Sequence, residues 1–241
     1  MNLVVDAGNT QIKAGIFEGN ELVYFLETYA FDEILNFISS YKIENTLLCS
    51  VIIISDEWLK ALKNISKLFI LDFKLPIPLN NFYKTPETLG MDRLAGVVGA
   101  SFLFPKKNCL IIDIGTCLKF DLVDQNNNYL GGSISPGLHM RFQSLHHFTS
   151  KLPILEPSLE KIDLIGNSTQ QAIQSGVING MIAEINGTIN RYNEKILDIQ
   201  LILCGGDALF FETKINQTIF AVPKLVLIGL NSILQHNVSK T

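Results

Sequence analysis

The sequence has 241 residues, of which 47% are hydrophobic and 17% are charged. A disordered chain would be poorer in apolar residues and a collagen-like chain far richer in glycine, so both classes are excluded. The net charge of −4 provides no electrostatic footprint for a nucleic-acid backbone or an anionic membrane. We therefore expect no nucleic-acid or membrane partner, and a small molecule or a protein instead.

The apolar segments are too short to cross a membrane. The densest are Leu47–Ile54 and Leu225–Leu230, whereas a spanning helix needs about 18–20 continuous apolar residues. The first residues lack a basic stretch and include Asp6, which is not typical of a signal peptide. The four cysteines form no Cys-x-x-Cys pair. Reduced thiols and a cytoplasmic location are therefore expected.

The first part of the chain predicts a β-meander followed by alternating helices and strands. Short apolar runs between polar turns indicate strands, and apolar residues at helical spacing indicate helices. Asp32 is the expected N-cap of the first helix. In chain order the pattern predicts strands over 3–5, 12–17 and 22–26, a helix over 31–38, a strand over 47–54, a helix over 56–65, a strand over 69–71, a loop over 76–86 and a helix over 90–104.

The second part begins as the first did, after a boundary expected at Pro105–Asn108. Val4–Thr10 and Ile111–Thr116 share one plan, in which an apolar strand is followed by Asp, any residue, Gly and a small polar residue. This indicates an internal duplication, with halves at 1–105 and 106–241. The further elements expected are strands over 110–112, 118–123 and 129–134, a helix over 168–192 with an apolar stripe that includes Ala172, a strand over 201–204 and a helix over 224–235.

The duplicated turn has the chemistry of a phosphate site. Gly8 lets the backbone approach a ligand closely, and the amides and hydroxyl of Asn9 and Thr10 can donate to phosphate oxygens. Lys13 supplies a cation, and Asp6 can hold Mg²⁺ directly or through water. A single such turn is most often only a hairpin turn. Two copies at matching places favour an anionic ligand that both halves bind.

Three other glycine-containing segments stand out, and the first two leave alternatives open. In Gly90–Arg93, Asp92 either complements a helix N-terminus or acts as a general base while Arg93 orients a substrate carboxylate. Gly205–Ala208 suits either close passage of a flat ligand such as adenine or an ordinary strand-to-helix turn. Gly131–Gly137 is too long and too polar to be only a turn.

Taken in order, these motifs resemble the type III pantothenate kinases over essentially the whole chain. Asp6–Lys13 is similar to the family pattern Asp-x-Gly-Asn-(Thr/Ser)-x-x-Lys, and Gly90–Arg93 to Gly-x-Asp-Arg. Asp113–Asp121 is similar to Asp-x-Gly-Thr-x-x-x-x-Asp, and Gly131–Gly137 to Gly-Gly-x-Ile-x-Pro-Gly. Cys117 departs from the alanine usual in the family, a change between small residues.

The resemblance implies an α/β fold of duplicated ribonuclease H-like (actin-like ATPase) domains. Each domain would have a mixed five-stranded sheet with helices, and ATP would bind in a cleft between them. The implied reaction transfers the ATP γ-phosphoryl group to the hydroxymethyl oxygen of pantothenate, the first step of coenzyme A synthesis. The implied cofactors besides ATP are Mg²⁺ and a monovalent cation, K⁺ or NH₄⁺.

The resemblance also assigns roles to residues. Asp92 would be the catalytic base, Asp113 would hold the monovalent cation, and Thr116 would contact ATP. The enzyme would be a homodimer with a shared active site, in which Thr169 reaches the neighbouring subunit's pocket, with adjacent Ser168 as the alternative hydroxyl. The other implied ATP-binding residues are Asp6, Ala7, Gly8, Asn9, Thr10, Gln11, Ile12 and Lys13, and the pantothenate-binding residues are Tyr83, Gly90, Met91, Asp92, Arg93 and Thr169.

Two alternatives remain open on the sequence. One is another small-molecule kinase of the same superfamily, acting on acetate or a sugar, although the Gly-x-Asp-Arg motif argues against it. The other is a regulatory protein of the accessory-factor type. Loss of Asp92 or of the phosphate turns would favour that alternative, and both are intact here.

Overall fold

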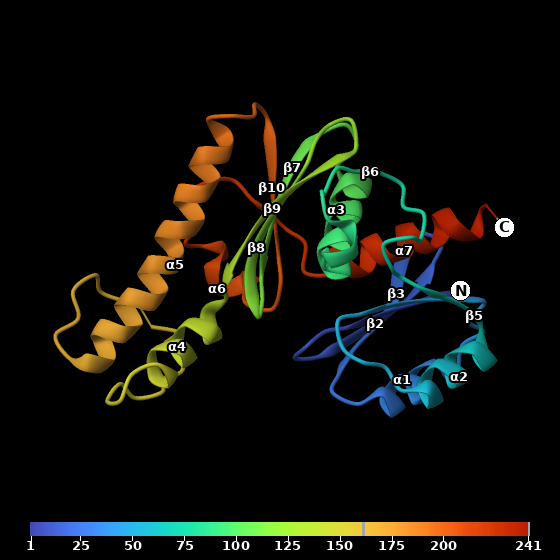
Figure 1. The fold of residues 1–241 in the computed structure, drawn as a ribbon, viewed down its shortest axis with the longest axis horizontal. Coiled ribbons are helices and arrows are strands. Elements are labelled where there is room, and N and C mark those ends of the chain that lie inside the picture. The colour runs from blue at the N-terminus through green and yellow to red at the C-terminus, as the bar shows by residue number, and fades with distance from the viewer. Residues whose placement is uncertain (161, 241) are drawn as a thin grey trace. The chain divides into compact units, whose positions relative to one another are not determined.

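The computed structural model describes residues 1–160 and 162–240 (Figure 1). Its contacts divide the chain into two compact units. The first unit comprises Met1–Lys106, Val123–Gly131 and the chain from Lys224, and the second comprises Lys107–Leu122 and Gly132–Pro223.

The first unit contains a mixed sheet of five strands in the order β3-β2-β1-β4-β5. Strand β1 runs antiparallel to β2 and parallel to β4, so the meander and the crossover strands meet at β1. This follows from the predicted alternation of strands and helices. The strands are β1 (Asn2–Ala7), β2 (Ile12–Glu18), β3 (Glu21–Thr28), β4 (Asn45–Ser50) and β5 (Lys67–Ile70).

Helices cover both faces of this sheet. Leu3 and Val5 of β1 pack with α1 (Phe31–Ile38) and α2 (Asp56–Ile65). Val4, on the opposite face, packs with α3 (Met91–Leu103) and α7 (Leu225–Val238). Alternate residues of a strand point to opposite faces, which is why β1 is buried on both sides and reads as a continuous apolar run.

The second unit repeats the strand order of the first. The second sheet runs β11-β10-β7-β8-β9-β6, and its five strands taken from β9 to β11 reproduce the order β3-β2-β1-β4-β5. Strand β6 and the first residues of β9 are counted with the first unit. Strand β10 is parallel to β7 and to β11, as β4 is to β1 and to β5. The duplicated α/β fold is therefore confirmed. The strands are β6 (Asn80–Asn81), β7 (Asn108–Ile114), β8 (Cys117–Val123), β9 (Asn128–Pro136), β10 (Ile199–Cys204) and β11 (Phe220–Ala221).

The core of the second unit lies between its sheet and three helices, α4 (Leu138–His147), α5 (Thr169–Asn193) and α6 (Ala208–Glu212). Helix α4 was not expected from the sequence, and α6 was implied only by one of the two interpretations of Gly205–Ala208. Both are short, and α4 has few apolar residues, so its helical period is weak. Alongside them, the 3₁₀ turn η1 (Pro86–Thr88) precedes α3 in the first unit.

Three local predictions were wrong. Asp32 lies within the first turn of α1, whose N-cap is Ala30. The strand predicted over 47–54 ends at Ser50, because the Ser50 hydroxyl accepts a hydrogen bond from the Ile52 amide at 3.1 Å and turns the chain. Ala172 is exposed on α5 and does not belong to the buried stripe of that helix.

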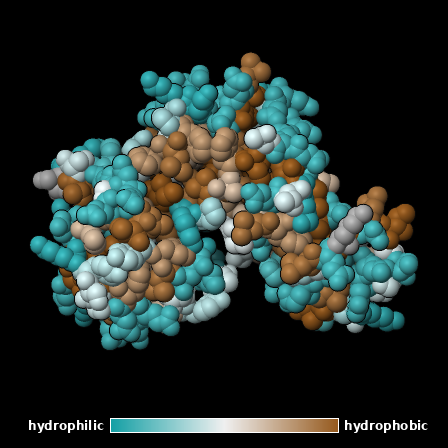
Figure 2. Space-filling model, turned by 180° about the vertical axis from the view of Figure 1, so that it is seen from behind, coloured by the Kyte–Doolittle hydropathy of each residue, from teal (hydrophilic) through white to brown (hydrophobic). Residues whose placement is uncertain are grey.

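The surface is hydrophilic over much of the face in Figure 2, with hydrophobic side chains in separate patches among the polar ones. The most exposed large hydrophobic residues include Leu159, Leu164, Ile165 and Phe148. Among the described residues, no helix combines the length and hydrophobicity needed to cross a membrane.

Candidate functional site

The β1–β2 turn, which the sequence predicts as the first phosphate site, is a tight turn between two paired strands. The Gly8 amide donates to the Gln11 carbonyl at 3.1 Å, which closes a tight turn with Asn9 and Thr10 exposed at its tip. A Cβ on Gly8 would lie 3.1 Å from that same carbonyl oxygen, so a larger residue would crowd the turn. Asp6 and Lys13 lie opposite each other across β1 and β2. The turn therefore presents amides, a hydroxyl, a carboxylate and a cation together.

Lys13 is part of a small charged cluster. Its ammonium is 3.5 Å from the Glu27 carboxylate on β3, and the Lys224 ammonium is 3.7 Å from the same oxygen. Burial lowers the pKa of Lys224, Glu27 raises it and Lys13 lowers it further. Two ammonium groups thus share one carboxylate beside the first turn.

Within the second unit the structure brings together the β7–β8 turn, Gly137 at the end of the predicted glycine segment, and Gly205. The Gly115 amide donates to the Cys117 carbonyl at 3.1 Å, and the Gly137 amide donates to the Thr116 carbonyl at 3.2 Å. Gly205 has φ of +98°, and a Cβ there would lie 2.5 Å from Asp113 Oδ1. Close backbone packing explains the need for glycine at 137 and 205.

The Asp113 carboxylate is paired with Lys119 on β8. The distance from Lys119 Nζ to Asp113 Oδ2 is 2.7 Å. Sequence reasoning did not single out Lys119, although both turns carry Thr-x-x-Lys, at Thr10–Lys13 and at Thr116–Lys119. An additional monovalent cation on this carboxylate would stand beside a like charge, so these residues do not fit the cation site implied by the resemblance.

Gly205–Ala208 forms a strand-to-helix turn into α6, one of the two alternatives left open by the sequence. The Asp207 amide donates to the Ile114 carbonyl at 2.9 Å, which ties this turn to the end of β7. Burial raises the pKa of Asp207, and His139, 3.9 Å away, partly offsets that rise.

Asp92 and Arg93 lie in the first turn of α3, as predicted. A Cβ on Gly90 would lie 2.6 Å from Asp92 Oδ1, so the carboxylate folds back over the helix start and would have to turn away to admit a larger residue. Arg93 is only 7% exposed, and its guanidinium lies 5.5 Å from the centroid of the Tyr83 ring. The Tyr83 ring in turn stacks on buried Tyr129, with centroids 6.0 Å apart and planes 4° apart.

Strand pairing places Tyr83 beside Arg93. Asn80 and Asn81 form β6 and pair with the start of β9, and the Phe82 amide donates to the Tyr129 carbonyl at 3.0 Å. The loop predicted over 76–86 thus contains a short strand. Sequence reasoning missed Tyr129 because its position in an apolar strand gives no sign of a role as a platform for Tyr83.

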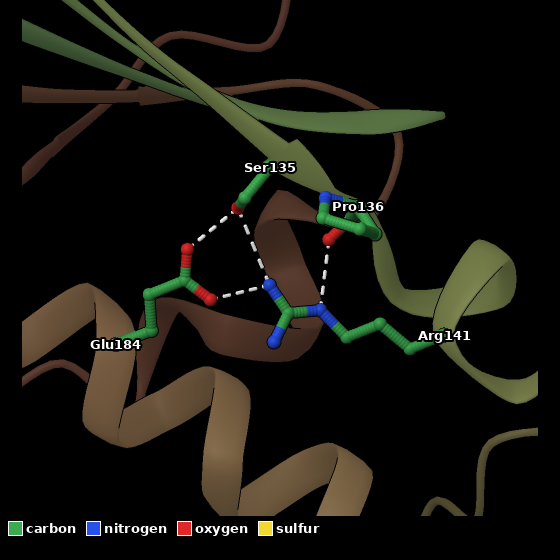
Figure 3. A network of polar contacts seen from close by, with 4 residues as sticks. All are labelled: Ser135, Pro136, Arg141 and Glu184. Atoms are coloured by element: carbon green, nitrogen blue, oxygen red, sulfur yellow. Dashed lines mark hydrogen bonds and ion pairs between the residues drawn. The ribbon is translucent and has the colours of Figure 1, made fainter. Parts of the chain in front are cut away.

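A polar network anchors the end of the Gly131–Gly137 segment (Figure 3). Arg141 of α4 donates through Nε to the Pro136 carbonyl at 2.8 Å and through a terminal nitrogen to Ser135 Oγ at 3.3 Å. The same guanidinium forms an ion pair with Glu184 of α5, whose other oxygen accepts from Ser135 Oγ at 2.6 Å. Helices α4 and α5 therefore hold this segment in place.

Ser168 and Thr169 have different surroundings at the start of α5. The Ser168 hydroxyl accepts from the Gln171 amide at 3.3 Å and caps the helix. Thr169 is exposed and lines a pocket of about 640 Å³ together with Arg141, Ala172 and Gly176. The Ser168 hydroxyl is therefore used by the helix cap, whereas Thr169 lies at the pocket.

In the first unit the structure thus joins Tyr83, Gly90, Met91, Asp92 and Arg93 at the start of α3, and separately forms the Asp6–Lys13 turn. In the second it joins Asp113, Thr116 and the glycine segments. Within 1–160 and 162–240, no group of three or more His, Cys, Asp or Glu side chains is arranged to hold a metal ion.

Comparisons with known proteins identify the family. A family model described as type III pantothenate kinase matches residues 2–191. The chain belongs to this family. A relative from Christiangramia forsetii named type III pantothenate kinase is 43% identical over 241 residues, covering 98% of this chain and 99% of the relative. Another of that name, from Cytophaga hutchinsonii, is 40% identical, covering 99% of this chain and 100% of the relative.

Solved structures support the fold. A Baf family protein from Campylobacter jejuni, named as a transcriptional activator, superposes with a TM-score of 0.63 at 21% identity, covering 98% of this chain and 99% of that one. The activator of 2-hydroxyisocaproyl-CoA dehydratase from Clostridium difficile, with bound ADPNP, superposes with a TM-score of 0.55 at 13% identity, covering 99% and 94%. At these identities the likeness concerns the fold alone.

Proposed function

We propose that this protein is a pantothenate kinase that transfers the γ-phosphoryl group of ATP to the hydroxymethyl oxygen of pantothenate. The observation that carries the proposal is the start of α3, where Asp92 and the buried Arg93 lie next to the Tyr83–Tyr129 stack. A guanidinium fixed over a ring has few orientations open to it and suits two-point binding of a carboxylate. Pantothenate carries such a carboxylate. Membership of the type III pantothenate kinase family supports the same assignment.

ATP would be bound by the two duplicated turns. Asp6–Lys13 would contact the phosphates through backbone amides, the Thr10 hydroxyl and Lys13, and Thr116 would contact them from the second turn. The tightness of both turns, each closed by a 3.1 Å hydrogen bond, supports this role. A Mg²⁺ ion bound with ATP would neutralise phosphate charge, and Asp6 is the residue suited to hold it. A monovalent cation at Asp113 is not part of this proposal, because Lys119 already pairs with that carboxylate.

Asp92 would act as the general base. It would accept the proton of the hydroxymethyl group as that oxygen forms a bond to the γ-phosphorus and the bond from phosphorus to the bridging oxygen of ADP breaks. Arg93 would hold the pantothenate carboxylate so that the hydroxyl points at the phosphorus. Positioning and charge neutralisation account for most of the rate in such reactions.

We also propose a homodimer in which Thr169 completes the pantothenate pocket of the neighbouring subunit. Helix α5 supports this, because Gly176, Gly180 and Gly187 leave open space where a side chain would begin, and Ala172 is exposed on the same helix. Small residues along a helix allow close approach of another backbone.

The test is direct. Purified protein with ATP and Mg²⁺ should form 4′-phosphopantothenate, and acetate and hexoses should not replace pantothenate in a substrate panel. Asp92→Asn should retain ATP binding measured by calorimetry and lose turnover. Glu87→Gln, an exposed acid-to-amide change in η1, is the control and should keep normal kcat. Near-normal kcat in Asp92→Asn would remove Asp92 as the base, and absence of phosphopantothenate would refute the activity.

A further inference from the structure

The ion pair between Asp113 and Lys119 lies within the second unit, at the turn that matches the second phosphate motif. Asp113 Oδ2 and Lys119 Nζ are 2.7 Å apart, at the short end of the range of about 2.7–2.9 Å for charge-assisted hydrogen bonds. The two side chains are only 17% and 15% exposed. The Lys119 ammonium is therefore held close to this carboxylate, whereas the side chains of an exposed ion pair are mobile.

The backbone also confines the other oxygen of the carboxylate. A Cβ on Gly205 would lie 2.5 Å from Asp113 Oδ1, and a Cβ on Gly115 would lie 3.8 Å from the same atom. Glycine backbone therefore packs on one side of Asp113, while Lys119 reaches it from the neighbouring strand β8. An external cation could approach the carboxylate only by displacing the ammonium or by standing close to a like charge.

A lysine ammonium and a small monovalent cation each neutralise a carboxylate with one positive charge. The resemblance names NH₄⁺ beside K⁺ as an occupant at Asp113, and NH₄⁺ shares its hydrogen-bonding nitrogen with the lysine head group. We infer that Lys119 supplies from within the chain the positive charge otherwise expected from a monovalent cation, so that the kinase works without K⁺ or NH₄⁺. The inference rests on the proposed pantothenate kinase activity.

The sequence repeat gives Lys119 a defined place. After the Gly of each turn, the segments read Asn-Thr-x-x-Lys at 9–13 and Thr-x-x-Lys at 116–119, so Lys119 is the counterpart of Lys13. The two lysines nevertheless have different partners, since Lys13 contacts Glu27 on β3 and Lys119 contacts Asp113. Both turns therefore have a lysine at this repeat position, but only the lysine of the second turn, Lys119, is paired with the Asp-x-Gly aspartate.

The decisive measurement is the cation dependence of the wild-type rate. Formation of phosphopantothenate from ATP and Mg²⁺ should be equally fast in KCl, NH₄Cl, NaCl and tetramethylammonium chloride at one ionic strength. Lys119→Ala should lose about tenfold or more in tetramethylammonium chloride and regain activity in KCl or NH₄Cl. Loss of a purely structural contact would not create a selective response to K⁺ and NH₄⁺. Lys107→Ala, at an exposed lysine of the same unit, should respond to none of the salts.

A second readout does not depend on turnover. The melting temperature of Lys119→Ala should be higher in KCl than in tetramethylammonium chloride, while that of the wild type should be the same in both. A wild-type enzyme active only with K⁺ or NH₄⁺ would overturn the inference and leave the proposed function standing. Absence of activity in every salt would refute the function, and the melting temperatures would then decide on the inference. If Lys119→Ala does not fold, the wild-type salt comparison decides alone.

Discussion

Helices α3 and α7 cross in close backbone contact at Gly99 and Gly229. The substitution Gly229→Ala tests whether this contact requires glycine. A Cβ at Gly229 would lie 1.8 Å from the Ala95 carbonyl oxygen and 2.8 Å from the Gly99 nitrogen, both backbone atoms. Real Cβ contacts are not shorter than 3.0 Å, so the two helices would have to separate by about 1.2 Å. Overpacking of this kind costs about 1–3 kcal/mol, occasionally more, and exceeds the roughly 1 kcal/mol that alanine gains over glycine in a helix.

We expect Gly229→Ala to lower the free energy of unfolding by up to about 2 kcal/mol, which in a chain of this size lowers the melting temperature by up to roughly 4–8 °C. The matched control is Gly96→Ala on α3, where an added Cβ meets nothing within 4 Å. That change should leave the melting temperature unchanged or raise it. Thermal unfolding followed by circular dichroism gives both values. If both substitutions change the melting temperature equally, then close contact between the helices is not the reason for glycine at position 229.

Two further predictions concern the start of α5 and the turn before α6. Ser168→Ala should cost about 1 kcal/mol of stability through the lost helix cap and leave the KM for pantothenate unchanged, whereas Thr169→Ala should raise that KM and leave the melting temperature nearly unchanged. The opposite pattern would exchange the roles of the two residues. Because burial raises the pKa of Asp207 above its ordinary 3.8, its contribution to stability is full below pH 3.8 and is lost as pH rises through the folded-state pKa. Asp207→Asn should therefore gain melting temperature relative to the wild type as pH rises above 3.8, and a difference independent of pH would contradict this.

Much of the fold could be predicted because its central strands, such as β1 and β7, are buried on both faces and its turns carry clear signals. Helix α2 occupies Asp56–Ile65 as expected, and the repeated Asp-x-Gly turns correctly indicated two sheets of the same plan. Helix α4 was missed because its core contacts come from only two buried residues, Leu138 and Phe142. A periodic pattern needs several turns of alternating burial before it can be recognised.

The candidate site was predictable in its motifs and less so in its contacts. Asp92 and Arg93 lie at the helix start that their Gly-x-Asp-Arg pattern indicated. Their aromatic neighbours come from a strand pairing between Asn81 and Tyr129, residues far apart in the sequence, which local patterns do not encode. The Lys119–Asp113 contact could have been suggested by the repeated Thr-x-x-Lys, but which carboxylate each lysine meets depends on side-chain packing.

The charges around the two turn lysines indicate different freedom of movement. Glu27 is 42% exposed and is shared by Lys13 and Lys224, so a move of Lys13 toward the proposed phosphate site would leave this carboxylate paired with Lys224. Lys119 has no such freedom, because its departure would leave the Asp113 carboxylate, 17% exposed, without that charge partner. The two lysines therefore differ in the cost of leaving their carboxylates. This difference follows from burial and from the number of cations per carboxylate, although both lysines occupy the same place in the repeat.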